Sequence, residues 1–85
     1  MTRAEFETAL QRWVTQSNAH AKDIRWQALL PLDIEAPTAL LATREMDRRY
    51  SMYRFTQAQW EKVDNVDKFF GIVALSMIHD IEDLA

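Results

Sequence analysis

VDKFFGIVALSMIHDIEDL, residues Val66–Leu84, is the stretch that decides the expected fold. Its centre, Phe69–Ile78, contains ten residues without a charge. Apolar side chains on such a helix point in nearly every direction, and a helix that is apolar on most faces is buried on most faces. In a chain of 85 residues, this segment is expected to be the central helix of a small bundle or half of a subunit interface.

Two long helices are expected before it. Thr2 and Glu5 have the spacing of a capping box, and helical spacing of apolar residues follows, so a helix is predicted over 3–19. Apolar residues at steps of three and four between Ala39 and Tyr53 predict a second helix over 38–54. The alternative is a strand over Tyr50–Phe55, because YSMYRF is rich in residues that favour strands.

The remaining segments are short. Residues 23–30 are expected to form a short helix that Pro31 ends, and 30–37 to form an extended, Pro-bounded connection between the two halves. An edge strand around Leu32–Ile34 is the alternative there. A second capping box, Thr56 with Gln59, opens another short helix. The chain is therefore predicted to be an all-α bundle of about four helices around a hydrophobic C-terminal helix.

The composition agrees with one small domain over residues 1–85. One Gly and two Pro are few for the tight turns of an all-β fold, which favours helices. The absence of Cys excludes disulfides and thiolate chemistry, and it suits the reducing cytoplasm. The N-terminal residues lack the apolar core of a signal peptide, and no run is long enough to span a membrane. We expect a cytoplasmic protein without a membrane segment.

The sequence contains few combinations of residues that could form a catalytic site. Ser17 with His20 and Ser76 with His79 are Ser–His pairs at helical spacing, but no Gly-rich turn that would form an oxyanion hole accompanies them. His79 has carboxylates three and four residues later, yet a metal-binding bundle needs ligands from several helices. We therefore expect no enzyme, no catalytic or metal-binding residues, and no cofactor.

Charge is unevenly distributed, although the net charge is only −3. Residues 44–54 contain four Arg and two acidic residues, whereas 61–85 contain six acidic residues and two Lys. Arg, Tyr and Trp are enriched in protein interfaces. The predicted partner-binding residues are Arg44, Arg48, Arg49 and Arg54 as charge anchors, with Tyr53 and a partly exposed Trp26 as contacts.

These features favour a small non-catalytic protein that occupies or bridges the surface of a larger protein partner. Inhibitors, immunity proteins, assembly chaperones and phage or plasmid regulators are proteins of this size, so the sequence suggests these classes by analogy. One alternative is a homo-dimer or larger homo-oligomer formed through the C-terminal helix. Another is weak nucleic-acid binding through Arg44–Arg54, which the acidic net charge argues against.

Overall fold

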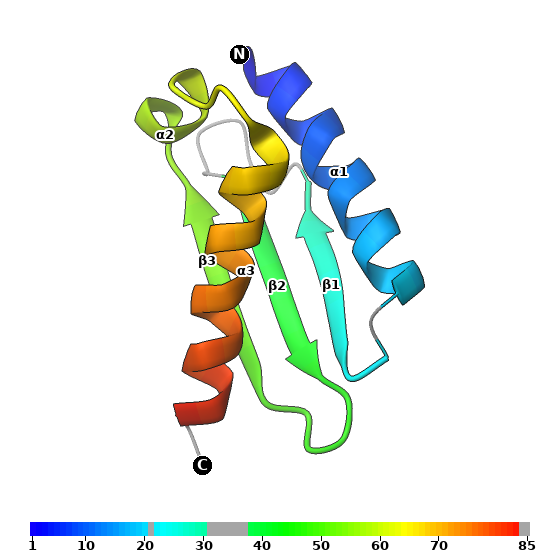
Figure 1. Cartoon of the computed structure of the whole chain (residues 1–85). Coiled ribbons are helices and arrows are strands. Elements are labelled where there is room, and N and C mark those ends of the chain that lie inside the picture. Colours follow the sequence, from blue (N-terminus) through cyan, green and yellow to red (C-terminus); the bar gives the residue numbers. More distant parts are fainter. Residues whose placement is uncertain (21, 31–37, 84–85) are drawn as a thin grey trace.

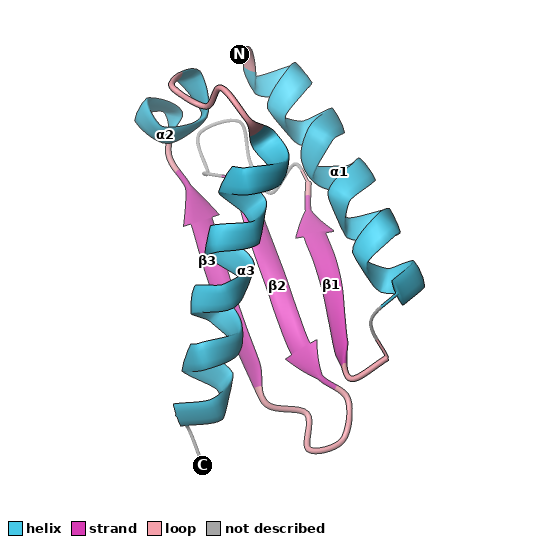
Figure 2. Ribbon diagram, viewed as in Figure 1, coloured by secondary structure: helices cyan, strands magenta, loops and turns pink. Residues whose placement is uncertain are grey.

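Two long helices cover one face of a three-stranded antiparallel sheet in the computed structural model, which describes residues 1–20, 22–30 and 38–83 (Figure 1). The strands lie in the order β1-β2-β3, and a short helix follows the last strand. The elements are α1 (Arg3–His20), β1 (Ile24–Leu29), β2 (Thr38–Arg44), β3 (Tyr50–Phe55), α2 (Gln57–Glu61) and α3 (Val66–Asp83). The fold is therefore mixed, with helices and sheet in two layers (Figure 2).

The prediction of an all-α bundle of four helices is wrong. The segment 38–54 is a β-hairpin made of β2 and β3, and 23–30 contains β1. The alternative of a strand over Tyr50–Phe55 is confirmed. Each of these strands pairs with a neighbour over its whole length, so tertiary pairing overrides the local helical spacing. Described residues form three helices, of which α2 has only five residues.

The helical predictions outside the sheet are confirmed. Thr2 and Glu5 form a reciprocal capping box, in which each residue's backbone N–H donates to the other's side chain at 3.0–3.1 Å. Before α2, the backbone N–H of Thr56 donates to Gln59 Oε1 at 2.8 Å. The expected extended segment over 30–37, with its alternative strand at Leu32–Ile34, lies almost entirely outside the described residues.

The register of the hairpins assigns each strand residue to one face of the sheet. Side chains alternate between faces along a strand, and directly paired residues share a face. The inner face, which the helices cover, comprises Ile24, Trp26, Ala28, Leu40, Ala42, Arg44, Ser51, Tyr53 and Phe55. The outer face comprises Arg25, Gln27, Leu29, Ala39, Leu41, Thr43, Tyr50, Met52 and Arg54.

Three phenylalanines from three elements form the centre of the core. Phe6 of α1, Phe55 of β3 and Phe70 of α3 have no exposed surface. Their ring centroids lie 5.1–6.0 Å apart in edge-to-face arrangements, a geometry that aromatic pairs prefer. Aromatic packing therefore fixes both long helices on the same face of the sheet.

The C-terminal helix is not the central rod that its composition predicts. Only one side of α3 packs on the sheet, through Phe70, Val73 and Met77. Ile72 and Leu75 on the other side are 60% and 70% exposed. A two-layer fold offers a helix a single face to cover, so the remaining apolar residues stay uncovered. No helix of the described residues is long and apolar enough to cross a membrane.

A side chain of α1 bonds to the edge of β1 that faces away from β2. Asn18 donates from Nδ2 to the carbonyl of Trp26 and accepts from its backbone N–H, both at 2.8 Å. The side-chain amide thus takes the place that a neighbouring strand would occupy. The Trp26 N–H and C=O are therefore not available to pair with a strand of another chain at this position of the edge.

Candidate functional site

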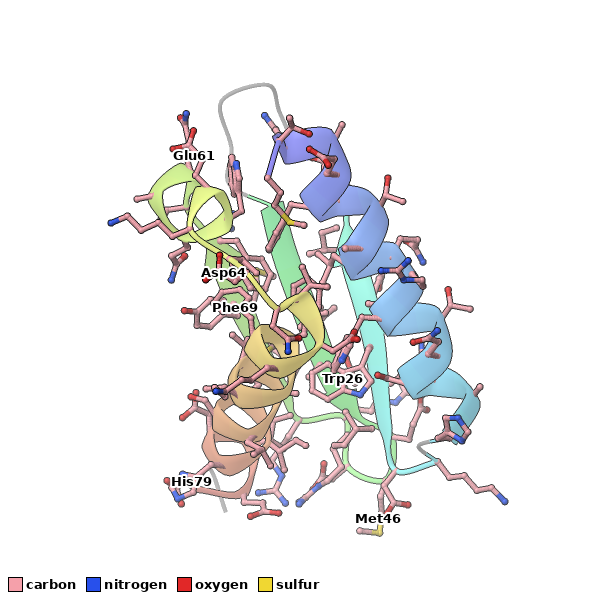
Figure 3. All side chains as sticks on the ribbon, turned by 45° about the horizontal axis from the view of Figure 1, so that its top comes forward. Trp26, Met46, Glu61, Asp64, Phe69 and His79 are labelled. Atoms are coloured by element: carbon pink, nitrogen blue, oxygen red, sulfur yellow. The ribbon has the colours of Figure 1, made fainter. Side chains whose placement is uncertain are left out.

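The residues predicted to bind a partner do not form one surface. Trp26 is 6% exposed and its ring lies 5.0 Å from that of Trp13, so the expectation of partial exposure is wrong. Figure 3 shows Trp26 turned inward toward the helical layer. Tyr53 is half-buried on the same face, where its ring packs on Phe55 and its hydroxyl accepts a hydrogen bond from Gln59 at 2.9 Å.

Two of the four predicted arginines stabilise the β2–β3 turn. The guanidinium groups of Arg44 and Arg49 both contact the carboxylate of Asp47, the latter through Nε at 2.6 Å. Arg49 also donates to the backbone carbonyl of Ile81 at 3.3 Å, near the C-terminal end of α3, where a cation is favoured. Both are therefore engaged in holding the turn, and Arg49 ties it to α3.

Arg48 and Arg54 are exposed, but they lie near opposite ends of β3. Arg48 is in the turn before β3, with a positive φ of 58°, and Arg54 is near the end of β3 on the outer face. Of the six predicted residues, Arg54 alone belongs to the outer face, and its neighbours there are residues that the sequence analysis did not single out.

The outer face consists of three rows of side chains set by the strand register. Arg25, Thr43 and Tyr50 form the row nearest the β2–β3 turn. The middle row is Gln27, Leu41 and Met52, and the third is Leu29, Ala39 and Arg54. Ala39 has no exposed surface, so the first two rows and Arg54 are the open part of this face. Since paired Cβ atoms lie about 5 Å apart, each row is one continuous strip of side chains.

This face combines exposed apolar side chains with positive charge. Tyr50 is 61% and Met52 41% exposed, and Leu41 between the strands is half-buried. Its nine residues include two Arg and no carboxylate. Arg25 lies 3.7 Å from Glu45 of the adjoining turn, and both side chains are more than half exposed, which makes this ion pair weak.

Alternation along YSMYRF is the signal that could have found this face. Tyr50, Met52 and Arg54 are separated by Ser51 and Tyr53, and a strand places these two sets on opposite sides. On a helix, Tyr50, Met52 and Arg54 would point in different directions and would not form one surface. The outer face therefore follows from the strand alternative alone.

A groove of about 640 Å³ lies between the C-terminal end of α3 and the start of the sheet. Ile24, Ile78 and Ile81 are its apolar residues, and Met46 is at its margin, at the tip of the β2–β3 turn (Figure 3). Its charged residues are of both signs, and Arg44 and Glu45 already have ion-pair partners. No set of polar groups converges on a ligand here, so the groove assigns no chemistry.

Neither metal nor acid–base chemistry emerges from the described part of the chain. No group of three or more potential metal-ligating side chains occurs among residues 1–20, 22–30 and 38–83. His79 pairs with Asp83 at 3.0 Å on the exposed side of α3. The pKa of Glu5 is lowered because the Thr2 backbone N–H and hydroxyl donate to its carboxylate, which belongs to the helix cap.

Comparisons with protein-family models, curated proteins and solved structures find no match to this chain. Function must therefore be argued from the surface itself, and the outer face is the surface with the most distinctive chemistry.

Proposed function

We propose that this chain is a small non-catalytic protein that binds an acidic surface of a larger protein through the outer face of its sheet. The observation that supports this proposal is the exposure of Tyr50 and Met52 between Arg25 and Arg54 on a face without a carboxylate. Tyr, Met and Arg are enriched in interface cores, whereas Asp and Glu are depleted there.

Charge complementarity identifies the chemistry of the partner. The outer face presents guanidinium groups at two diagonally opposite corners, with Tyr50 and Met52 between them, so its complement is an apolar patch flanked by carboxylates. Arg favours such contacts because its planar group binds a carboxylate through two hydrogen bonds.

A nucleic-acid partner is less well supported. The outer face has two cations, and the chain as a whole has a net charge of −3. Binding of nucleic acid depends on several phosphate contacts and requires a basic surface. The absence of Cys supports the further proposal that the protein acts in the cytoplasm, where thiols stay reduced and disulfides are rare.

The test compares matched variants in quantitative pull-downs from nuclease-treated host lysate. Arg54→Glu and Met52→Asp change the outer face, and Arg12→Glu makes the same charge change as the first at an exposed position of α1. We expect one protein to be retained by the wild type and by the Arg12 variant. Each outer-face variant should weaken its binding at least about tenfold, a change of about 1.4 kcal/mol.

Synthetic peptides then test the stated chemistry. Poly-glutamate should displace the captured protein, and poly-lysine should not. Equal retention by all variants would refute the outer face as the binding surface. Loss of all captured material after nuclease treatment, together with steeply salt-dependent binding of an oligonucleotide, would instead establish a nucleic-acid partner.

A further inference from the structure

The strand register determines which backbone groups of β3 point away from the sheet. The backbone N–H of Arg44 donates to the carbonyl of Arg49 at 2.7 Å, which fixes the pattern of bonds between β2 and β3. In an antiparallel ladder, alternate residues direct both N–H and C=O to the same neighbour. Even-numbered residues of β2 therefore bond to β3, and odd-numbered residues of β3 bond to β2. The residues of β3 that direct both groups away from β2 are Tyr50, Met52 and Arg54. We call the N–H and C=O groups of these three residues the β3 edge.

The opposite edge of the sheet supports this assignment. The backbone N–H of Glu45 donates to the carbonyl of Asp23 at 3.0 Å, so the same alternation directs the groups of Trp26 away from β2. That is where the Asn18 amide binds them, with both bonds at 2.8 Å. The edge of β1 thus has a side chain bound at its centre.

The β3 edge has no such partner. Within residues 1–20, 22–30 and 38–83, no hydrogen bond reaches the backbone groups of its three residues, all of which are exposed. Proteins commonly protect such an edge with a proline, a β-bulge or a side chain that covers it. YSMYRF contains no proline, and its pairing with β2 is regular throughout. The β3 edge is therefore open to pairing with another strand.

We propose that an extended segment of the acidic partner pairs with the β3 edge as a fourth, antiparallel strand. This inference rests on the proposed function, because the side chains of the same three residues belong to the outer face. Directly paired residues share a face of the sheet, so alternate side chains of the added strand would join the outer face. Charge complementarity places a carboxylate opposite Arg54, and apolar side chains belong opposite Met52 and Tyr50.

A second copy of the chain fits this edge less well than a bare segment does. α3 lies over β3 (Figure 1). Two β3 strands pair antiparallel about an axis perpendicular to the sheet, which puts both α3 helices on the same side. Neighbouring strands are about 4.8 Å apart, whereas packed helices need about 8–10 Å. An extended segment without a helix above it avoids this conflict.

The backbone and the side chains would have separate roles in this contact. Three residues offer six backbone groups, so an added strand gains hydrogen bonds whatever its sequence. Main-chain bonds supply affinity in strand addition, and side chains at alternate positions supply specificity. The guanidinium of Arg54 would then select an acidic segment among extended ones.

A synthetic peptide, acetyl-TETVTVT-amide, tests the pairing directly. Its Glu stands opposite Arg54 in the antiparallel register, and its two Val stand opposite Met52 and Tyr50. In a nuclear magnetic resonance titration with peptide up to about 1 mM, the amides of these three residues should exchange more slowly with solvent. Unchanged exchange at all three amides would overturn the proposal.

Matched peptides separate the backbone from the side chains. The central Val directs its N–H at the β3 edge, so methylation of that nitrogen should weaken binding at least about tenfold. The Thr before it directs its N–H away, and methylation there should leave the affinity unchanged. Lys in place of Glu should also weaken binding, because it would meet Arg54. Equal affinity of the two methylated peptides would contradict strand pairing.

Two variants of the protein test the same edge against the captured partner. Met52→Ala and Met52→Pro both remove the methionine side chain, but only proline also removes the edge N–H. Proline is tolerated on an edge strand where its nitrogen faces away from the sheet, and circular dichroism checks that the variant folds. We expect the proline variant to bind the partner at least about tenfold more weakly than the alanine variant.

The outcomes keep the two proposals apart. Equal binding by the alanine and proline variants, with the three edge amides unprotected in the complex, would overturn strand pairing and leave the outer face as the site. Failure to capture any protein would refute the proposed function, while the peptide titration would still measure pairing at the edge. A wild-type dimer with the same three amides protected would make a second copy the occupant and overturn the proposal.

Discussion

Replacing Asn18 by Ala should destabilise the fold, although alanine is the better helix former. The change removes both hydrogen bonds between the Asn18 amide and the backbone of Trp26. Each bond contributes about 1 kcal/mol net, so the loss is about 2 kcal/mol. The gain in helix propensity is about 0.5 kcal/mol, which leaves a net loss of about 1.5 kcal/mol.

This loss is large for a small domain. A chain of this size typically has a free energy of unfolding of about 4–13 kcal/mol. A change of 1.5 kcal/mol should lower the melting temperature by about 6–12 °C. Thermal unfolding followed by circular dichroism measures it, and hydrogen exchange should show that the Trp26 amide loses its protection.

Two matched variants isolate the cause. Thr15→Ala, at an exposed position of the same helix, measures the effect of alanine without the Trp26 contact. Asn18→Asp keeps the acceptor for the Trp26 N–H but removes the donor, and it places a carboxylate against the Trp26 carbonyl. It should therefore be destabilised as well. An Asn18→Ala protein as stable as the wild type, with the Trp26 amide still protected, would refute the role assigned to this side chain.

Three further changes concern the cap and the turn. The pKa of Glu5 is lowered in the folded chain, so its ionised carboxylate stabilises the fold above the unfolded pKa, and this stabilisation is lost as pH falls through the folded pKa. Thr2→Ala should flatten this pH dependence of the free energy of unfolding, measured by urea unfolding between acid and neutral pH. Arg49→Ala should cost about 1–2 kcal/mol in thermal unfolding, whereas Arg48→Ala, which breaks no side-chain bond, should change little. Arg48→Gly should raise stability by up to about 1 kcal/mol, because glycine adopts a positive φ without strain; a lower melting temperature would contradict this.

The helices could be predicted because their signals are local. Thr2 with Glu5 and Thr56 with Gln59 open helices as their spacing indicates. The buried stripe of α3, from Phe70 to Ile81, also follows the predicted helical period. Capping and one-sided periodicity depend on neighbours along the chain, so they can be identified without knowing what lies across the core.

The sheet could not be predicted in the same way because it depends on distant pairing. Ala39–Arg44 contains good helix formers, and its steps of three and four continue through Met46 to Tyr53. The turn that separates the strands uses Arg48 at positive φ, where a glycine would have signalled it. The low glycine content was therefore a misleading argument for helices, because this turn forms without a glycine. The candidate site was lost with the sheet, because the outer face exists only when β1, β2 and β3 are side by side.

The C-terminal helix shows how an incorrect fold prediction also misplaces burial. It was expected to be buried on most faces, but Ile72 and Leu75 remain exposed. Their exposure cannot stabilise the monomer, since apolar side chains contribute by leaving water. Tyr50 and Met52 on the outer face have the same property. The two sets lie on opposite sides of the molecule, one on the sheet and one on the helical layer.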